Sequence, residues 1–161
     1  MGKPPKTLCL TLKAEPESVP RARRALNDFA AAAGADRGQL DAVRLASSEA
    51  MTNAVVHAYH DRAGDVYVTA ALVSNELWIL VADDGCGLKP RADRPGLGLG
   101  LGLISQVVDD MAVVARARGG TEVRMRFDLG DGGFTRRRAA PAGEATRNGR
   151  SNHRPRRRSV V

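Results

Sequence analysis

Three polar side chains recur at a four-residue spacing within the segment SEAMTNAVVHAY, namely Glu49, Asn53 and His57. In an α-helix, residues at i, i+4 and i+8 lie on one stripe. A carboxylate and an amide on one stripe suit a Mg²⁺-phosphate site, because Asn53 can offer its carbonyl oxygen to the metal and Glu49 can orient or deprotonate a hydroxyl or a water. The alternative is a solvated helix face, which fits Asn53 less well because Asn is a mediocre helix former.

A second group of residues, Asp83-Asp84-Gly85-Cys86-Gly87, directly follows a predicted strand that ends at Ala82. A carboxylate at a strand end can accept a hydrogen bond from the exocyclic amino group of a purine, and the glycines beside it leave room for the flat ring. The same residues are also ordinary for a tight turn, so this segment alone leaves both interpretations open.

The segment GLGLGLGLI, residues 96–104, alternates glycine with leucine before an apolar helical pattern. A glycine-rich loop that opens a helix can bind phosphate, because bare backbone N–H groups approach the oxygens and the helix dipole favours negative charge. The dinucleotide fingerprint G-x-G-x-x-G lacks its third glycine here, and the G-K-[ST] of a P-loop is absent. For this run alone, a flexible linker or a lid hinge is the alternative.

Metal and thiol chemistry find less support in the sequence. His57, His60 and Asp61 suggest a metal cluster, but no further ligand is suitably spaced for one. Cys9 and Cys86 offer neither metal-ligand spacing nor a disulfide framework, so no chemical role is assigned to them.

Apolar periodicity predicts the elements that must position these groups. Strands are expected at residues 8–12, 66–73, 77–82, 112–116 and 121–129. Helices are expected from a cap at Ser18 to Gly34, from Asp36 to about Tyr59, and after the glycine run, where one face would carry Ile104, Val107, Val108 and Met111. This order predicts an α+β fold, a two-layer α/β sandwich with a mixed sheet and helices on one face.

Charge divides the chain into two parts. Its 161 residues, 43% of them hydrophobic, suffice for one domain with a real core. Residues 1–129 hold 16 basic and 16 acidic residues, whereas residues 130–161 hold 9 Arg and 2 acidic residues. The second part has almost no large apolar residues, so we expect a domain at 1–129 and a disordered Arg-rich tail at 130–161. The tail could contact nucleic acid, an acidic partner or a membrane surface, although a solvated extension is the simpler interpretation.

Nothing in the sequence predicts a membrane protein. It contains no run of 18 or more apolar residues and no signal-peptide pattern, so a cytoplasmic location is expected. We also expect no direct DNA binding by the domain, because its own charges balance. The sequence leaves open whether the chain is a monomer or a homodimer.

The ordered combination of E-A-x-T-N-A-x-x-H-A, D-x-G-x-G, G-x-G before a helix and G-T before a last strand resembles the histidine-kinase-like ATPase superfamily. Within it, the chain is most similar to the bacterial anti-sigma factor serine/threonine-protein kinases, over roughly residues 7–129. EAMTNAVVHAY is close to the N-box helix of that family, and VDDM at residues 108–111 resembles its acidic turn. The resemblance implies a Bergerat-type sandwich around ATP and Mg²⁺.

The resemblance also implies roles for single residues. Asn53 would be the Mg²⁺ ligand and Glu49 the catalytic base. Asp83 would hold the adenine amino group, with support from Thr121 on the last strand. Gly85 and Gly87 would shape the pocket for the base. Gly98 and Gly100 would offer backbone N–H groups to the phosphates.

The function implied by this resemblance is that of an ATP-binding anti-sigma regulatory factor. It would sequester a sigma factor and phosphorylate a serine or threonine of an anti-sigma factor antagonist protein. A third interpretation, a detached ATPase domain of a histidine phosphotransfer system, is disfavoured because no phosphoacceptor helix precedes Thr7 in this sequence.

One departure from the family affects catalysis. Only eight residues, LKPRADRP, separate Gly87 from Gly96, whereas family members carry a longer lid with a basic residue that faces the phosphates. Arg91 or Arg94 could take that role. The short segment favours the alternative of a catalytically silent ATP-binding module that regulates transcription by partner exchange, whereas Glu49 favours an enzyme.

Overall fold

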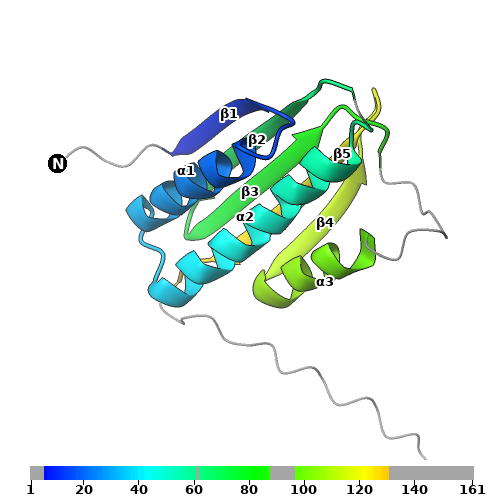
Figure 1. Ribbon diagram of the computed structural model, residues 1–161. Coiled ribbons are helices and arrows are strands. Elements are labelled where there is room, and N and C mark those ends of the chain that lie inside the picture. The colour runs from blue at the N-terminus through cyan, green and yellow to red at the C-terminus, as the bar shows by residue number, and fades with distance from the viewer. Residues whose placement is uncertain (1–5, 61, 88–96, 131–161) are drawn as a thin grey trace, which may run out of the picture.

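The computed structural model describes residues 6–60, 62–87 and 97–130. In this part of the chain, one sheet is covered on one face by helices (Figure 1). The strands are β1 (Thr7–Lys13), β2 (Asp65–Val73), β3 (Glu76–Asp83), β4 (Asp110–Ala115) and β5 (Thr121–Asp128). The helices are α1 (Ser18–Ala32), α2 (Arg37–His57) and α3 (Leu97–Val107). The predicted two-layer α/β sandwich is therefore confirmed.

The sheet has the strand order β1-β2-β3-β5-β4, and every pairing between the described strands is antiparallel. The expectation of a mixed sheet was wrong in this respect. The pairings β1–β2 and β3–β5 are antiparallel although helices lie between these strands in the chain. The other two pairs, β2–β3 and β4–β5, are consecutive in the chain, and antiparallel neighbours of this kind can be joined by a tight turn. β4 and β5 are joined in this way through Gly119 and Gly120, at φ of 97° and 90°.

Alternating side chains of the central strands form the core beneath the helices. Leu77, Ile79 and Val81 of β3 are buried, and so are Val123, Met125 and Phe127 of β5. The helices contribute small and medium apolar residues, among them Leu26 of α1 and Val43, Ala46, Ala50 and Met51 of α2. This packing fixes α2 across the sheet, with β3 and β5 below it.

The two N-terminal helices begin differently from each other. Asp36 and Gln39 form a capping box at the start of α2, where a helix start was predicted. Ser18, predicted to cap α1, instead lies inside its first turn, and Glu17 at the N-cap makes no side-chain hydrogen bond to the helix. Ser18 is fully buried, and its hydroxyl makes no hydrogen bond with the described residues.

The third helix begins earlier than the sequence indicated. α3 begins at Leu97, within the glycine-leucine run, and ends at Val107. Met111, predicted on its apolar face, lies in β4 instead. Packing explains the earlier start, since burial of Ile104 offsets the cost of about 1 kcal/mol that each glycine adds to a helix. Met111 is paired with Met125 of β5 instead.

Parts of three predictions lie outside the described residues. These are the lid segment between Gly87 and Gly96, the metal candidate Asp61, and the Arg-rich tail beyond Gly130. In the part of the chain that the structure describes, no helix has the length and apolar character needed to cross a membrane.

Candidate nucleotide-binding site

The middle of α2 faces the first turns of α3, and this contact brings the predicted metal and phosphate residues together (Figure 1). A methyl group on Gly100 would lie 2.9 Å from Glu49 Oε2 and 3.3 Å from Asn53 Nδ2. Glu49 and Asn53 thus border the space beside Gly100, which is too small for a side chain. The spacing argument that placed Glu49 and Asn53 on one stripe of a helix agrees with this geometry.

The amide of Asn53 has a hydrogen-bond donor without a partner. Asn53 Nδ2 is buried, and no described residue accepts a hydrogen bond from it. Such a donor costs about 1–3 kcal/mol unless a ligand or a water satisfies it. Together with the half-buried carboxylate of Glu49, the amide provides the oxygen donors that Mg²⁺ prefers and leaves a donor for a phosphate oxygen. These residues therefore fit a Mg²⁺-nucleotide.

The first turn of α3 supplies backbone donors at the same place. The initial N–H groups of a helix have no intrahelical acceptor, and the positive end of the helix dipole lies there. Gly98 and Gly100 both fall within the first four residues of α3. That turn contains no acidic residue that would repel an anion. The glycines are helical rather than part of a loop, yet their position still suits phosphate binding.

Asp83 lies at the end of β3, where it is only 6% exposed. Its carboxylate accepts hydrogen bonds from the backbone amide of Gly85, at 2.9 Å, and from that of Thr121. Burial raises the pKa of Asp83, and the two amides and the positive charge of Arg116 act against that rise. The support of Asp83 by Thr121 that the resemblance implied is present as this backbone contact.

Close approaches of the backbone hold the loop around Asp83 in place. A side chain on Gly85 would lie 2.1 Å from the carbonyl oxygen of Ala58, and one on Gly120 would lie 1.9 Å from that of Asp83. Cys86 N donates to the same Ala58 oxygen at 2.8 Å, so the loop is tied to the end of α2. Ala58 follows Asn53 by about 7.5 Å along the helix axis. One helix therefore spaces the loop around Asp83 from Glu49 and Asn53.

Sequence reasoning missed two residues that hold this loop. Asp84 N donates to the buried hydroxyl of Tyr59 at 2.9 Å, and that hydroxyl in turn donates to Asp65 O. Arg116 Nη1 donates to Asp83 O at 3.0 Å and forms an ion pair with Asp84. Tyr59 ends the motif segment EAMTNAVVHAY, but nothing in that segment indicates its contact with Asp84. Arg116 belongs to none of the motifs, and the second acidic residue of the Asp83-Asp84 pair was the only signal that a basic partner was needed.

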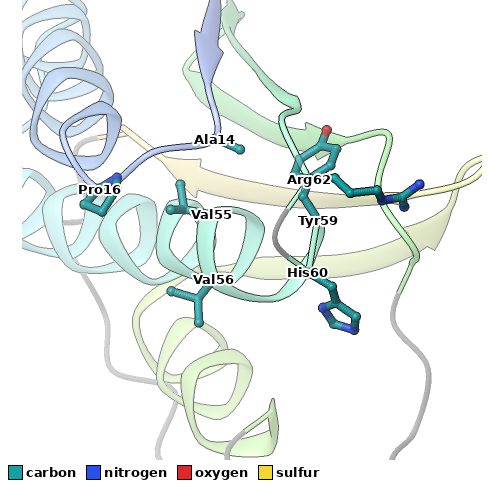
Figure 2. Close-up of a pocket in the computed structure, with 7 residues that line it drawn as sticks. All are labelled: Ala14, Pro16, Val55, Val56, Tyr59, His60 and Arg62. Atoms are coloured by element: carbon teal, nitrogen blue, oxygen red, sulfur yellow. The ribbon is translucent and has the colours of Figure 1, made fainter.

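A separate cavity of about 640 Å³ opens beside the C-terminal turns of α2 (Figure 2). Its walls come from the segment before α1 and from the end of α2, through Ala14, Pro16, Val55, Val56, Tyr59, His60 and Arg62. None of the predicted site residues lines it. Because the described residues of its walls include no carboxylate or side-chain amide for a metal, we do not assign the nucleotide to this cavity.

Comparison with known proteins identifies the family. The family described as histidine kinase-like ATPase domain matches residues 12–127. The chain belongs to this family. The match includes both parts of the candidate site, from Glu49 and Asn53 on α2 to Asp83 and Thr121. The family predicted from the sequence motifs is thus confirmed.

Relatives of this family member include proteins with regulatory and kinase names. It is 30% identical over 125 residues to an anti-sigma F factor of Clostridium acetobutylicum, a match that covers 71% of this chain and 86% of the relative. It is 33% identical over 90 residues to a serine-protein kinase RsbW of Bacillus thuringiensis, covering 47% of this chain and 56% of that kinase.

A solved structure supports the fold. The crystal structure of the RsbU and RsbW domains of a Mycobacterium tuberculosis protein matches with a TM-score of 0.62 and 27% identity. The match covers 76% of this chain and 32% of that longer one, so the similarity is to one portion of a larger protein.

Proposed function

We propose that this family member is an ATP-binding anti-sigma regulatory factor with serine/threonine-protein kinase activity. It would sequester a sigma factor and phosphorylate an anti-sigma factor antagonist protein. The observation that carries the proposal is the contact of Glu49 and Asn53 with Gly100, where a buried amide donor has no described partner. The names of the anti-sigma F factor and RsbW relatives support the choice of partners.

The residues divide the work of phosphoryl transfer between them. Bound ATP with Mg²⁺ would supply the γ-phosphoryl group. Asn53 would hold the metal through Oδ1, and the first turn of α3 would donate its amides to the phosphates. Glu49 would accept the proton of the substrate hydroxyl, while the hydroxyl oxygen bonds to the γ-phosphorus and ADP leaves. Asp83 would fix the adenine amino group at the far end of the site.

The short segment between Gly87 and Gly96 favours a second candidate, a catalytically silent ATP-binding module. Its eight residues are fewer than the lid implied by the family resemblance. Such a module would bind ATP and exchange a sigma factor for its antagonist without phosphoryl transfer. Both candidates share the nucleotide site, and they differ in whether Glu49 has a chemical role.

Two substitutions on the same stripe of α2 test the kinase. We expect Glu49→Gln to lower phosphoryl transfer by about a hundredfold or more while ATP still binds, because the base is lost but the size and hydrogen bonding are kept. Asn53→Ala should weaken ATP binding and transfer together, because Mg²⁺ loses its protein ligand. Transfer would be followed with ATP labelled at the γ-phosphate and a lysate of the source organism, and binding by calorimetry.

The wild-type protein decides between the two candidates. If it labels no protein, and Glu49→Gln captures a sigma factor as well as wild type does, the silent module is correct. If wild type labels an antagonist protein and Glu49→Gln labels it equally fast, Glu49 is not the base.

A further inference from the structure

Arg116 directly follows β4, and its backbone closes the turn that leads into β5. Arg116 N donates to Gly120 O at 3.2 Å, and Gly119 N donates to Arg116 O at 3.0 Å. Thr121 is the next residue after this turn, and its backbone amide donates a hydrogen bond to the Asp83 carboxylate. The position of Arg116 along the chain therefore couples it to one of the two hydrogen bonds on the Asp83 carboxylate.

The side chain of Arg116 extends to the loop that follows β3, at Asp83 and Asp84. Its Nη1 donates to Asp83 O at 3.0 Å and forms an ion pair with the carboxylate of Asp84. The guanidinium lies over the ring of Tyr67, 5.4 Å from its centroid, and the Tyr67 hydroxyl is hydrogen-bonded to Asp84. Planar guanidinium groups are suited to such simultaneous contacts, which an ammonium group would not reproduce.

These contacts lie on the sheet face opposite the helices. Tyr67 alternates with the buried residues Val66 and Val68 of β2, so its side chain points away from the core. Asp83 points the other way, into the buried side of β3. Arg116 thus contacts the end of β3 from the face opposite the helices. The proposed adenine contact of the Asp83 carboxylate lies on the other face, so Arg116 does not occupy that space.

We propose that Arg116 is a positioning residue for the adenine end of the nucleotide, which holds the Asp83 backbone and the Thr121 turn in register from the outer face of the sheet. The inference rests on the proposed nucleotide binding by Asp83. It adds a residue that has no place in the motifs of the sequence and that acts on the ligand only through Asp83.

The charges around Asp83 give this role a signature in the pH dependence of binding. Arg116 lowers the pKa of Asp83 and Asp84 raises it, while the buried phenol of Tyr59 nearby stays neutral because its own pKa is raised by burial. The ionised carboxylate is the better acceptor for the adenine amino group, because protonation turns one of its oxygens into a donor. Loss of the positive charge should therefore move the acid limit of ATP binding to higher pH, and loss of the Asp84 charge should move it to lower pH.

The test compares Arg116→Met, Arg116→Lys and Asp84→Asn with wild type, using calorimetric ATP affinity from acid to neutral pH and thermal melting. Arg126→Met is the matched control, because Arg126 Nη1 is 2.9 Å from Glu76 Oε1 on the same sheet face and its side chain is 27% exposed, against 33% for Arg116. We expect Arg116→Met to weaken ATP binding about tenfold, because Asp83 O and the Asp84 carboxylate lose their shared donor. Its acid limit should rise, and Arg116→Lys should keep the wild-type limit with part of the affinity lost.

Opposite shifts of the acid limit in Arg116→Met and Asp84→Asn would support the role, since a general loss of folding stability would weaken both variants in the same direction. If wild type binds ATP and Arg116→Met keeps both its affinity and its acid limit, the positioning role is wrong while the nucleotide site stands. The positioning role is also wrong if Arg126→Met weakens ATP binding as much as Arg116→Met does. Absence of ATP binding by wild type would overturn the nucleotide site and this inference together.

Discussion

At the residue scale, Asp83 combines its proposed contact with the adenine amino group with a cost to folding stability. The carboxylate is buried at the end of β3, and burial raises its pKa even though two backbone amides and Arg116 act against the rise. A raised pKa in the folded state means that the folded protein binds the proton more tightly than the unfolded chain does. The contribution of Asp83 to stability is therefore greatest below the ordinary pKa of Asp and declines as pH rises through the raised value.

Asp83→Asn should separate that cost from binding. At neutral pH we expect the free energy of unfolding to be unchanged or higher, because the neutral amide avoids burying a charge and its oxygen can still accept a hydrogen bond from Gly85. ATP affinity should fall by about 2 kcal/mol or more, since the amide presents donors to the adenine amino group. Calorimetry and chemical denaturation check the two expectations.

The pH dependence supplies the control for this variant. Any stability gain of Asp83→Asn over wild type should shrink on acidification, as wild-type Asp83 becomes protonated. If the variant binds ATP as tightly as wild type at neutral pH, Asp83 does not hold the adenine.

The residues of the candidate site differ in how far their positions could be predicted. Glu49 and Asn53 were predictable because helical periodicity alone places them on one stripe, whichever way the chain folds around them. Arg116 was not, because its partner Asp84 lies 32 residues away and meets it only through the pairing order of the sheet. Tyr59 was recognised as a helix end, but its contact with Asp84 depends in the same way on tertiary structure.

At the scale of elements, α3 shows where local sequence preference and tertiary packing disagree. Alternating glycines argue against a helix by about 1 kcal/mol each, so a helix start after the run was the reasonable expectation. Packing against α2 reverses that preference, because Ile104 becomes fully buried and Gly100 contacts Glu49 and Asn53. The strands and α2 were predicted more closely, since their apolar periodicity and capping residues agree with their final environment.

Two glycines of α3 allow a matched test of this packing. A side chain on Gly102 would meet nothing within 4 Å, whereas one on Gly100 would press on Glu49 and Asn53. Gly102→Ala should raise the free energy of unfolding by about 0.5–1 kcal/mol and leave ATP binding and transfer unchanged. Gly100→Ala should gain less stability and lower phosphoryl transfer by about tenfold or more, because displacement of a catalytic group by a fraction of an ångström is costly.

Denaturation curves and the γ-phosphate transfer assay measure the two effects. If both Gly100→Ala and Gly102→Ala transfer phosphate at the wild-type rate, the contact between the helices does not position Glu49. A loss of transfer in both variants would instead assign the effect to stiffening of α3 as a whole.

At the scale of the whole molecule, the folded body and the C-terminal segment have different electrostatic character. Residues 1–129 carry equal numbers of basic and acidic residues, and residues 130–161 account for the formal charge of +7. The family match ends at residue 127, within β5, so the shared fold is complete before the charged segment begins. Nucleotide binding and polyanion binding should therefore reside in different parts of the chain.

Deletion of residues 131–161 tests this division. The melting temperature and ATP affinity should stay within error of the full chain, because the described core and the candidate site lie at or before β5. Retention on a heparin column should fall sharply, since nine arginines are removed with only two acidic residues. The salt dependence of any nucleic-acid binding should also become weaker.

As a control, the full chain with every arginine beyond residue 130 changed to glutamine should match the deletion in heparin retention and in melting temperature. A fall of several degrees in melting temperature for the deletion alone would show that uncharged residues of the segment pack on the body, and the separation into folded domain and charged tail would have to be abandoned.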